Sequence, residues 1–159
     1  MSFPDNNTEN AVGVEVTTST LRAVCIGADG AIVDAHAAPL IRGNDVLPQI
    51  VGFINELRSK FGTFDRIGIT FPGLIHRDSR RIAFSSYFPD LHGIDVLGEL
   101  EAKTRLKVLI ENDANAAGFG EFSFGAGRDS RNMFYVTLGT GVPAGTNLGT
   151  NLNLSLIHI

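Results

Sequence analysis

The chain has a single cysteine and no long apolar run, and these scarcities exclude several classes of protein. One cysteine, Cys25, cannot form a disulfide within the chain, and it supplies too few thiolates for a cysteine-based metal site. It lies in an apolar stretch, which predicts a small core residue. No segment approaches the roughly 20 apolar residues of a membrane-spanning helix. Residues 1–10 also lack the basic start and apolar stretch of a signal peptide, so we expect a cytoplasmic protein without a membrane partner.

Basic clusters and metal-ligand spacings are scarce as well. The formal net charge is −4, and the densest basic segment, at residues 77–81, is interrupted by Asp78. Because nucleic-acid binding needs clustered Lys and Arg, we expect no nucleic-acid partner. The four histidines show no metal-ligand spacing, so we expect surface histidines and no metal-ligating residue. Hydrophobic residues make up 43% and charged residues 19% of the 159, which is a globular composition.

The apolar periodicity predicts an α/β fold with a mixed sheet. We expect strands at 11–16, 21–26, 31–37, 65–71, 107–110 and 133–138, the first three joined as an antiparallel meander through the Asp-Gly turn at 29–30. Helices are expected from 44–45 to Gly62, over 95–106 and over 114–124. The domain prediction is a disordered leader at 1–10, a lobe at 11–127 and the start of a second lobe at 131–159.

The richest polar segment, residues 111–117, follows the predicted strand that ends at Ile110. A carboxylate held at a strand-to-helix junction can serve as a general base, because rigid elements fix it while its side chain faces a cleft. Asp113 has that position. Asp is also a favoured helix N-cap, so Asp113 could instead satisfy the first amides of a helix that begins near Ala114. These residues alone leave both roles open.

Two glycine turns and a hydroxyl run are further candidates. Gly139-Thr140-Gly141 follows a strand, so its backbone could approach a phosphate, although a plain tight turn would have the same sequence. Gly73 ends a buried strand and could form either a turn or a loop that bends over a ligand. The hydroxyls of residues 85–87 suit a sugar, and they equally suit solvent.

Four blocks, taken in order, resemble the ROK family of sugar kinases and sugar-responsive repressors. They are Gly-Ile-Thr-Phe-Pro-Gly at 68–73, Glu-Asn-Asp-Ala-Asn-Ala-Ala at 111–117 with Gly-Glu at 120–121, Gly-Ala-Gly at 125–127, and Val-Thr-Leu-Gly-Thr-Gly at 136–141. The order and spacing are more specific than any single block. The resemblance spans about residues 11–145 and covers about the first half of a typical family member.

The resemblance implies an actin-like, ribonuclease-H-like ATPase lobe, with the second lobe truncated. It also implies transfer of the γ-phosphoryl of ATP to a hexose or N-acetylhexosamine with Mg²⁺, as in a glucokinase, and a homo-oligomeric full-length form. Asp113 would be the catalytic base and a sugar ligand, Asn112 would bind the sugar, and Gly73 would shape the sugar loop. The residues implied at the nucleotide are Glu15, Gly139, Thr140 and Gly141.

Departures from the family pattern open a second hypothesis. The family's phosphate loop, Asp-Ile-Gly-Gly-Thr-Lys, aligns with residues 15–20, where threonines replace both glycines and Thr20 replaces the lysine. Tyr87 stands near the family's sugar-contacting asparagine, and Pro143 stands where a glycine is expected. The alternative is therefore a non-catalytic sugar-binding regulator or a degenerate kinase. Because the second lobe has only begun at Ile159, we also expect a truncated reading frame.

Overall fold

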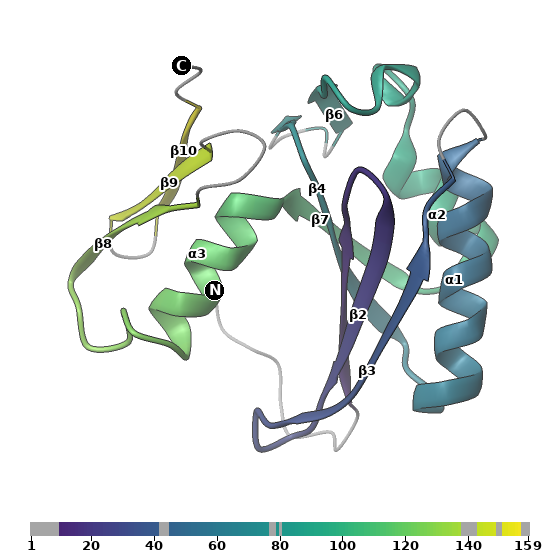
Figure 1. Cartoon of the computed structure of the whole chain (residues 1–159), viewed down its shortest axis with the longest axis horizontal. Coiled ribbons are helices and arrows are strands. Elements are labelled where there is room, and N and C mark those ends of the chain that lie inside the picture. The colour runs from purple at the N-terminus through teal and green to yellow at the C-terminus, as the bar shows by residue number, and fades with distance from the viewer. Residues whose placement is uncertain are drawn as a thin grey trace. The chain divides into compact units, whose positions relative to one another are not determined.

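The computed structural model describes residues 10–41, 45–76, 79 and 81–137, together with the backbone of two strands at 143–148 and 151–156. Two compact units divide between Glu111 and Asn112. The first contains a five-stranded sheet with its helices, and the second contains one helix and a three-stranded sheet (Figure 1). Each unit is described by itself below.

The sheet of the first unit has the strand order β3-β2-β1-β4-β7. β1 (Ala11–Val16), β2 (Thr20–Ile26) and β3 (Ile32–Pro39) form the antiparallel meander expected from the sequence. β4 (Arg66–Phe71) runs parallel to β1, so the sheet is mixed as predicted. β7 (Lys107–Asn112) begins beside the start of β4, where the Lys107 N–H donates to the Asp65 carbonyl at 2.9 Å.

Alternating side chains place one face of this sheet in the core. Val12, Val14 and Val16 of β1 are buried, while their neighbours along the strand are not. The facing residues of β2 are buried too, and they include Cys25 at 1% exposure. Cys25 is therefore a core residue, as its apolar surroundings indicated.

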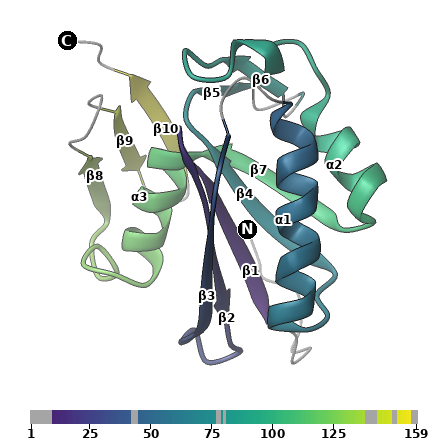
Figure 2. The same cartoon turned by 45° about the vertical axis from the view of Figure 1, so that its right-hand side comes forward.

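Two helices cover that buried face and contact each other (Figure 2). They are α1 (Val46–Phe61) and α2 (Val96–Thr104). The side chains of α1 that face the core lie at helical spacing: Ile50, Phe53, Ile54 and Leu57. Gly62 ends α1 with φ 81°, a left-handed value that glycine adopts without a Cβ clash.

The start of α1 is fixed by a side chain inside the helix rather than by its N-cap residue. Asp45 is the N-cap residue, but its side chain makes no capping hydrogen bond. Gln49 fixes this end instead, because its amide nitrogen donates to the carbonyls of Ile41 and Asp45 while its Oε1 accepts from the Ile41 N–H at 2.8 Å. A longer side chain one turn inside the helix thus holds the preceding segment.

The end of α2 differs from expectation, by two residues. The helix stops at Thr104, because Arg105 takes the left-handed conformation with φ 56° and donates its N–H to the Glu101 carbonyl at 2.8 Å. Lys103 is exposed and pairs with Glu99 at 3.1 Å. The buried residue of this turn is Thr104.

Between the two helices the chain forms the hairpin of β5 (Leu74–His76) and β6 (Arg81–Phe84) and the short 3-10 helix η1 (Pro89–Leu91). The segment is anchored to the sheet by Phe71 and Phe88, whose rings meet edge to face with centroids 6.4 Å apart.

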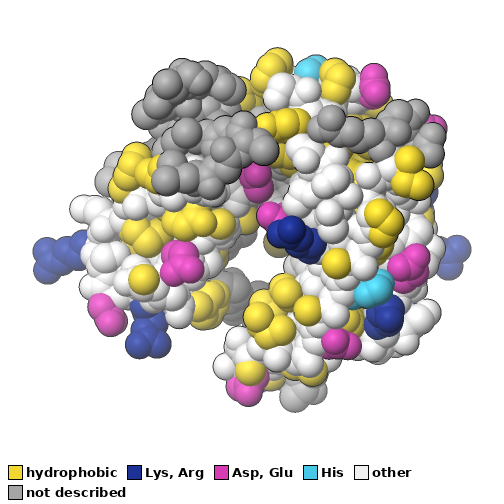
Figure 3. Space-filling view, in the orientation of Figure 1, with side chains coloured by type: hydrophobic (Ala, Val, Ile, Leu, Met, Phe, Trp, Pro, Cys, Tyr) yellow, Lys and Arg dark blue, Asp and Glu magenta, His cyan; other side chains and the backbone are white. Residues whose placement is uncertain are grey.

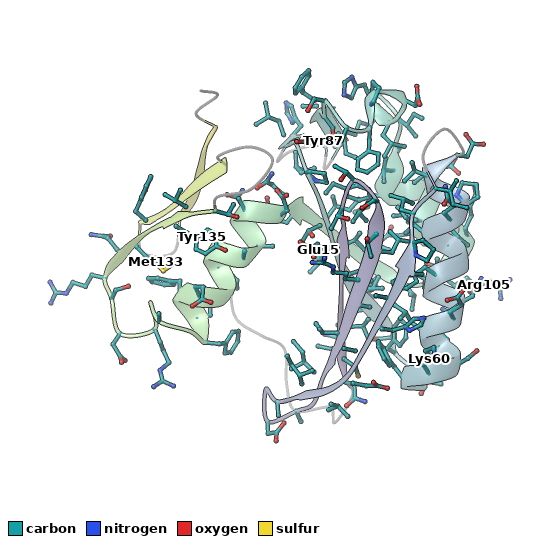
Figure 4. The ribbon with its side chains drawn as sticks, viewed as in Figure 1. Glu15, Lys60, Tyr87, Arg105, Met133 and Tyr135 are labelled. Carbon is teal, nitrogen blue, oxygen red and sulfur yellow. The ribbon has the colours of Figure 1, made fainter. Side chains whose placement is uncertain are left out.

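The second unit contains α3 (Asp113–Ser123), which contacts a three-stranded antiparallel sheet. The strands are β8 (Asn132–Val136), β9 (Pro143–Leu148) and β10 (Asn151–Leu156), in the order β10-β9-β8. A close approach joins α3 to β8, since a Cβ on Gly118 would lie 3.2 Å from the Tyr135 Cβ. Tyr135 is labelled beside Met133 in Figure 4.

Arg105 supplies a test of the strain at the end of α2. Replacing it by glycine removes the Cβ that opposes a positive φ, so we expect Arg105→Gly to raise the free energy of unfolding by about 1 kcal/mol. Chemical denaturation measures this change, with Arg105→Ala as the control that keeps the Cβ. A glycine variant no more stable than the alanine variant would contradict the assignment.

Candidate functional site

The residues predicted to form the site belong to both units. Glu15 and Gly73 lie in the first unit, and Asn112 and Asp113 open the second. The predicted nucleotide residues Gly139, Thr140 and Gly141 lie outside the described residues. The structure therefore gives three local geometries: the junction at Asn112, the turn at Gly73 and the turn after Glu15.

The junction between β7 and α3 shows which residue caps the helix. Asn112 has extended dihedral angles, φ −67° and ψ 144°, and its Oδ1 accepts from the Asn115 N–H at 3.0 Å. The expectation that Asp113 caps a helix beginning near Ala114 is therefore wrong, because the last extended residue takes that place and its amide oxygen reaches the third amide of the helix. Asn112 is buried, at 1% exposure.

Asp113 is instead the first residue of α3, and it is half-buried. Its Oδ1 accepts from the Ala114 N–H at 2.9 Å. A carboxylate in the first turn of a helix is favoured in its ionised form, because the partial positive charge of the helix N-terminus lies beside it. The N-cap hydrogen bond to the Asn115 N–H is made by Asn112 and not by Asp113.

Gly73 occupies a conformation that requires glycine. Its φ is 141°, and a Cβ built on it would lie 2.9 Å from the Ser85 Cβ and close against the Phe84 carbonyl oxygen. The turn after β4 is therefore pressed against the segment that follows β6. A side chain at position 73 would push these two segments apart.

The turn after Glu15 is closed by its own threonine. Thr17 Oγ1 accepts from the Ser19 N–H at 3.3 Å and from the Thr20 N–H at 2.9 Å, and it donates to the Thr20 carbonyl at 2.9 Å. The Thr17 N–H donates to the same carbonyl at 2.9 Å. A phosphate cradle needs backbone N–H groups that point toward the ligand. The N–H groups of Thr17, Ser19 and Thr20 are bonded within the turn, so these three amides are not available to cradle a phosphate.

Glu15 lies on the face of β1 opposite the buried valines and is labelled in Figure 4. It faces Arg22 across the β1–β2 pair, with 3.6 Å between Glu15 Oε2 and an Arg22 guanidinium nitrogen. In the part of the chain that is described, no group of three or more His, Cys, Asp or Glu is arranged to hold a metal.

The sequence did not indicate the roles of Ser85, which contacts Gly73, and of His92, which contacts Ser85. The Ser85 hydroxyl was left open between a sugar and solvent, and the residue is buried at 1% exposure. His92 was expected to be a surface histidine, and it is exposed, but its Nε2 lies 2.7 Å from the Ser85 nitrogen. Tyr87, labelled in Figure 4, is 37% exposed. It also lines a cavity of about 610 Å³ with residues that precede and begin α1.

Charged side chains are scattered over the face drawn in Figure 3, where the described basic residues form no continuous patch. Among the described helices, none has the length and apolar character needed to cross a membrane.

The comparisons with known proteins agree with the fold and the motifs. The family model described as "ROK family" matches residues 11–154, and the chain belongs to the ROK family. A glucokinase from Thermotoga maritima is 36% identical over 137 residues, which cover 84% of this chain and 43% of that protein. A xylose repressor from Bacillus subtilis is 31% identical over 149 residues, covering 89% of this chain and 38% of that protein.

A solved structure gives the same result for the fold. The ROK family glucokinase from Streptomyces griseus, in complex with glucose and AMPPNP, has a TM-score of 0.77 and 26% identity, covering 94% of this chain and 48% of that one. The chain thus spans less than half the length of each of these three proteins, and its fold matches the N-terminal lobe of the ROK kinases. The predicted actin-like α/β lobe and the family resemblance are confirmed, while the site residues stay predictions.

The Asn112 cap can be tested by a pair of variants. Asn112→Ala removes the oxygen that accepts from the Asn115 N–H, so we expect a loss of about 1 kcal/mol in the free energy of unfolding. Asn112→Ser removes a similar volume but keeps a capping oxygen, and it should retain most of that stability. Urea denaturation of the two variants compares them directly, and equal stabilities would argue against the cap.

Proposed function

We propose that the full-length protein binds a hexose or an N-acetylhexosamine, with Asn112 and Asp113 as sugar ligands and Gly73 shaping the sugar loop. The observation that carries the proposal is the junction at Asn112, which caps α3 and leaves the Asp113 carboxylate in the first helical turn. An ionised carboxylate in that setting is a strong acceptor for sugar hydroxyls. The similar Streptomyces griseus glucokinase was solved with glucose, which supports this ligand class.

The first candidate activity is phosphorylation of that sugar by ATP, with Asp113 as general base. Phosphoryl transfer depends mostly on positioning and on an oriented nucleophile. Asp113 would accept the proton of the attacking sugar hydroxyl. Similarity to glucokinases supports this activity and the use of ATP with Mg²⁺. Of the implied nucleotide residues, only Glu15 is described, and three amides of the turn after it are not available to cradle a phosphate.

Asp113→Asn tests both the sugar site and the base. The amide keeps the shape but cannot accept the hydroxyl proton, so we expect sugar phosphorylation to fall by about 10²-fold or more. A coupled assay with Mg-ATP and a panel of glucose, mannose and N-acetylglucosamine measures the rate, and calorimetry measures the sugar Kd. Full activity of the variant would exclude Asp113 as the base. A folded wild type that binds no sugar of the panel would exclude hexose binding.

The second candidate is a non-catalytic sugar-binding regulator. The turn at residues 17–20 favours it, because the amides of Ser19 and Thr20 are bonded to the Thr17 hydroxyl. Similarity to a xylose repressor is consistent with this activity. Calorimetric titration of the full-length protein separates the two candidates. Sugar binding with no nucleotide binding supports the regulator, whereas tight, Mg²⁺-dependent ATP binding eliminates it.

A further inference from the structure

Ser85 occupies a buried position between two segments of the first unit. It follows β6 directly and precedes Tyr87 and η1. Among the described residues, few polar side chains are buried as fully. Thr104, another of them, donates its Oγ1 to the Leu100 carbonyl at 2.6 Å, which is a bond within a single helix. The Ser85 hydroxyl instead bonds to a residue 13 positions away.

The Ser85 hydroxyl joins the turn at Pro72–Gly73, here called the Gly73 turn, to the segment at residues 86–88, here called the Tyr87 loop. It donates to the Pro72 carbonyl at 2.6 Å, and it accepts from the Tyr87 N–H at 3.3 Å and from the Phe88 N–H at 3.2 Å. A hydroxyl has one donor and two acceptor lone pairs, so these three bonds use its whole capacity. One oxygen atom therefore fixes the residue before Gly73 and the backbone of Tyr87 at once.

The side chain of His92 contacts the backbone of Ser85. Its Nε2 lies 2.7 Å from the Ser85 nitrogen and 3.0 Å from the Ser85 carbonyl oxygen. A backbone N–H can only donate, so the contact with the Ser85 nitrogen uses Nε2 as the acceptor. The imidazole also packs against Phe84, with ring centroids 5.6 Å apart. The position of Phe84, the residue before Ser85, is thereby fixed as well.

The turn at Gly73 is also in direct contact with Phe84 and Ser85. Gly73, with φ 141°, leaves no room for a Cβ against the Phe84 and Ser85 backbone. The turn that ends β4 and the loop that carries Tyr87 therefore meet without an intervening side chain. A displacement of Ser85 would move both segments together.

We propose that Ser85 is a positioning residue for sugar binding, which fixes the Gly73 turn relative to the Tyr87 loop and is itself held by His92. This proposal rests on the proposed function, because it assumes that the Gly73 turn borders the sugar. Ser85 acts through the two loops rather than by touching the ligand.

Removal of the hydroxyl in the full-length protein tests the proposal. Ser85→Ala leaves the Pro72 carbonyl and two N–H groups without their partner, so we expect the Kd for the tightest-binding sugar among glucose, mannose and N-acetylglucosamine to rise about tenfold. The matched control is Thr104→Val, which removes another buried hydroxyl of the same unit and should lower Tm while leaving the sugar Kd unchanged. Calorimetry and thermal denaturation give the two readouts.

A second pair of variants tests the same connection without opening a space at Ser85. His92→Gln keeps an acceptor for the Ser85 N–H and should bind sugar as the wild type does. His92→Leu lacks one and should bind more weakly. A wild type that binds no sugar of the panel would defeat the proposed function. If the wild type binds, a Ser85→Ala Kd equal to that of Thr104→Val, or a His92→Leu Kd equal to that of His92→Gln, would overturn the role of Ser85.

Discussion

The parallel alignment of β4 with β1 is the constraint on which the candidate site depends. The register pairs Val12 with Ile67 and Glu15 with Thr70, so the two strands reach their carboxyl ends at the same edge of the sheet. β7 begins beside the start of β4 and runs to Asn112. β1 and β4 are each followed directly by a segment with predicted function, the turn at residues 17–20 and the Pro72–Gly73 turn. Turns at the carboxyl ends of such strands are where α/β proteins commonly bind ligands.

Local patterns in the sequence predicted most of the regular elements. Strict alternation specified the buried face of β1, and Gly62 marked the end of α1, because both signals act over a few residues. The helix ends without a glycine were less predictable. Arg105 carries no signal for a left-handed residue, and the choice between Asn112 and Asp113 as cap depends on where the extended backbone stops. The predicted division into lobes stays a prediction.

The role of Ser85 could not be predicted from the sequence, since its partners come from separate segments. Its hydroxyl bonds to Pro72 across the β5–β6 hairpin, and its backbone bonds to His92 across η1. A hydroxyl in a run of polar residues gives no sign of such burial. The sequence did identify the Gly73 turn, because a glycine after a buried strand is itself a conformational signal.

The turn at residues 17–20, here called the Thr17 turn, also shows what this segment would need in order to hold a phosphate. A glycine-rich phosphate loop leaves amides for water or phosphate to satisfy, so an occupant contributes to its order. Here the threonine hydroxyl has already satisfied the amides of Ser19 and Thr20. Substitution of Thr17 alone would free the amides of Ser19 and Thr20, but residue 20 would still carry no positive charge. A phosphate site at this turn would therefore need changes at both positions together.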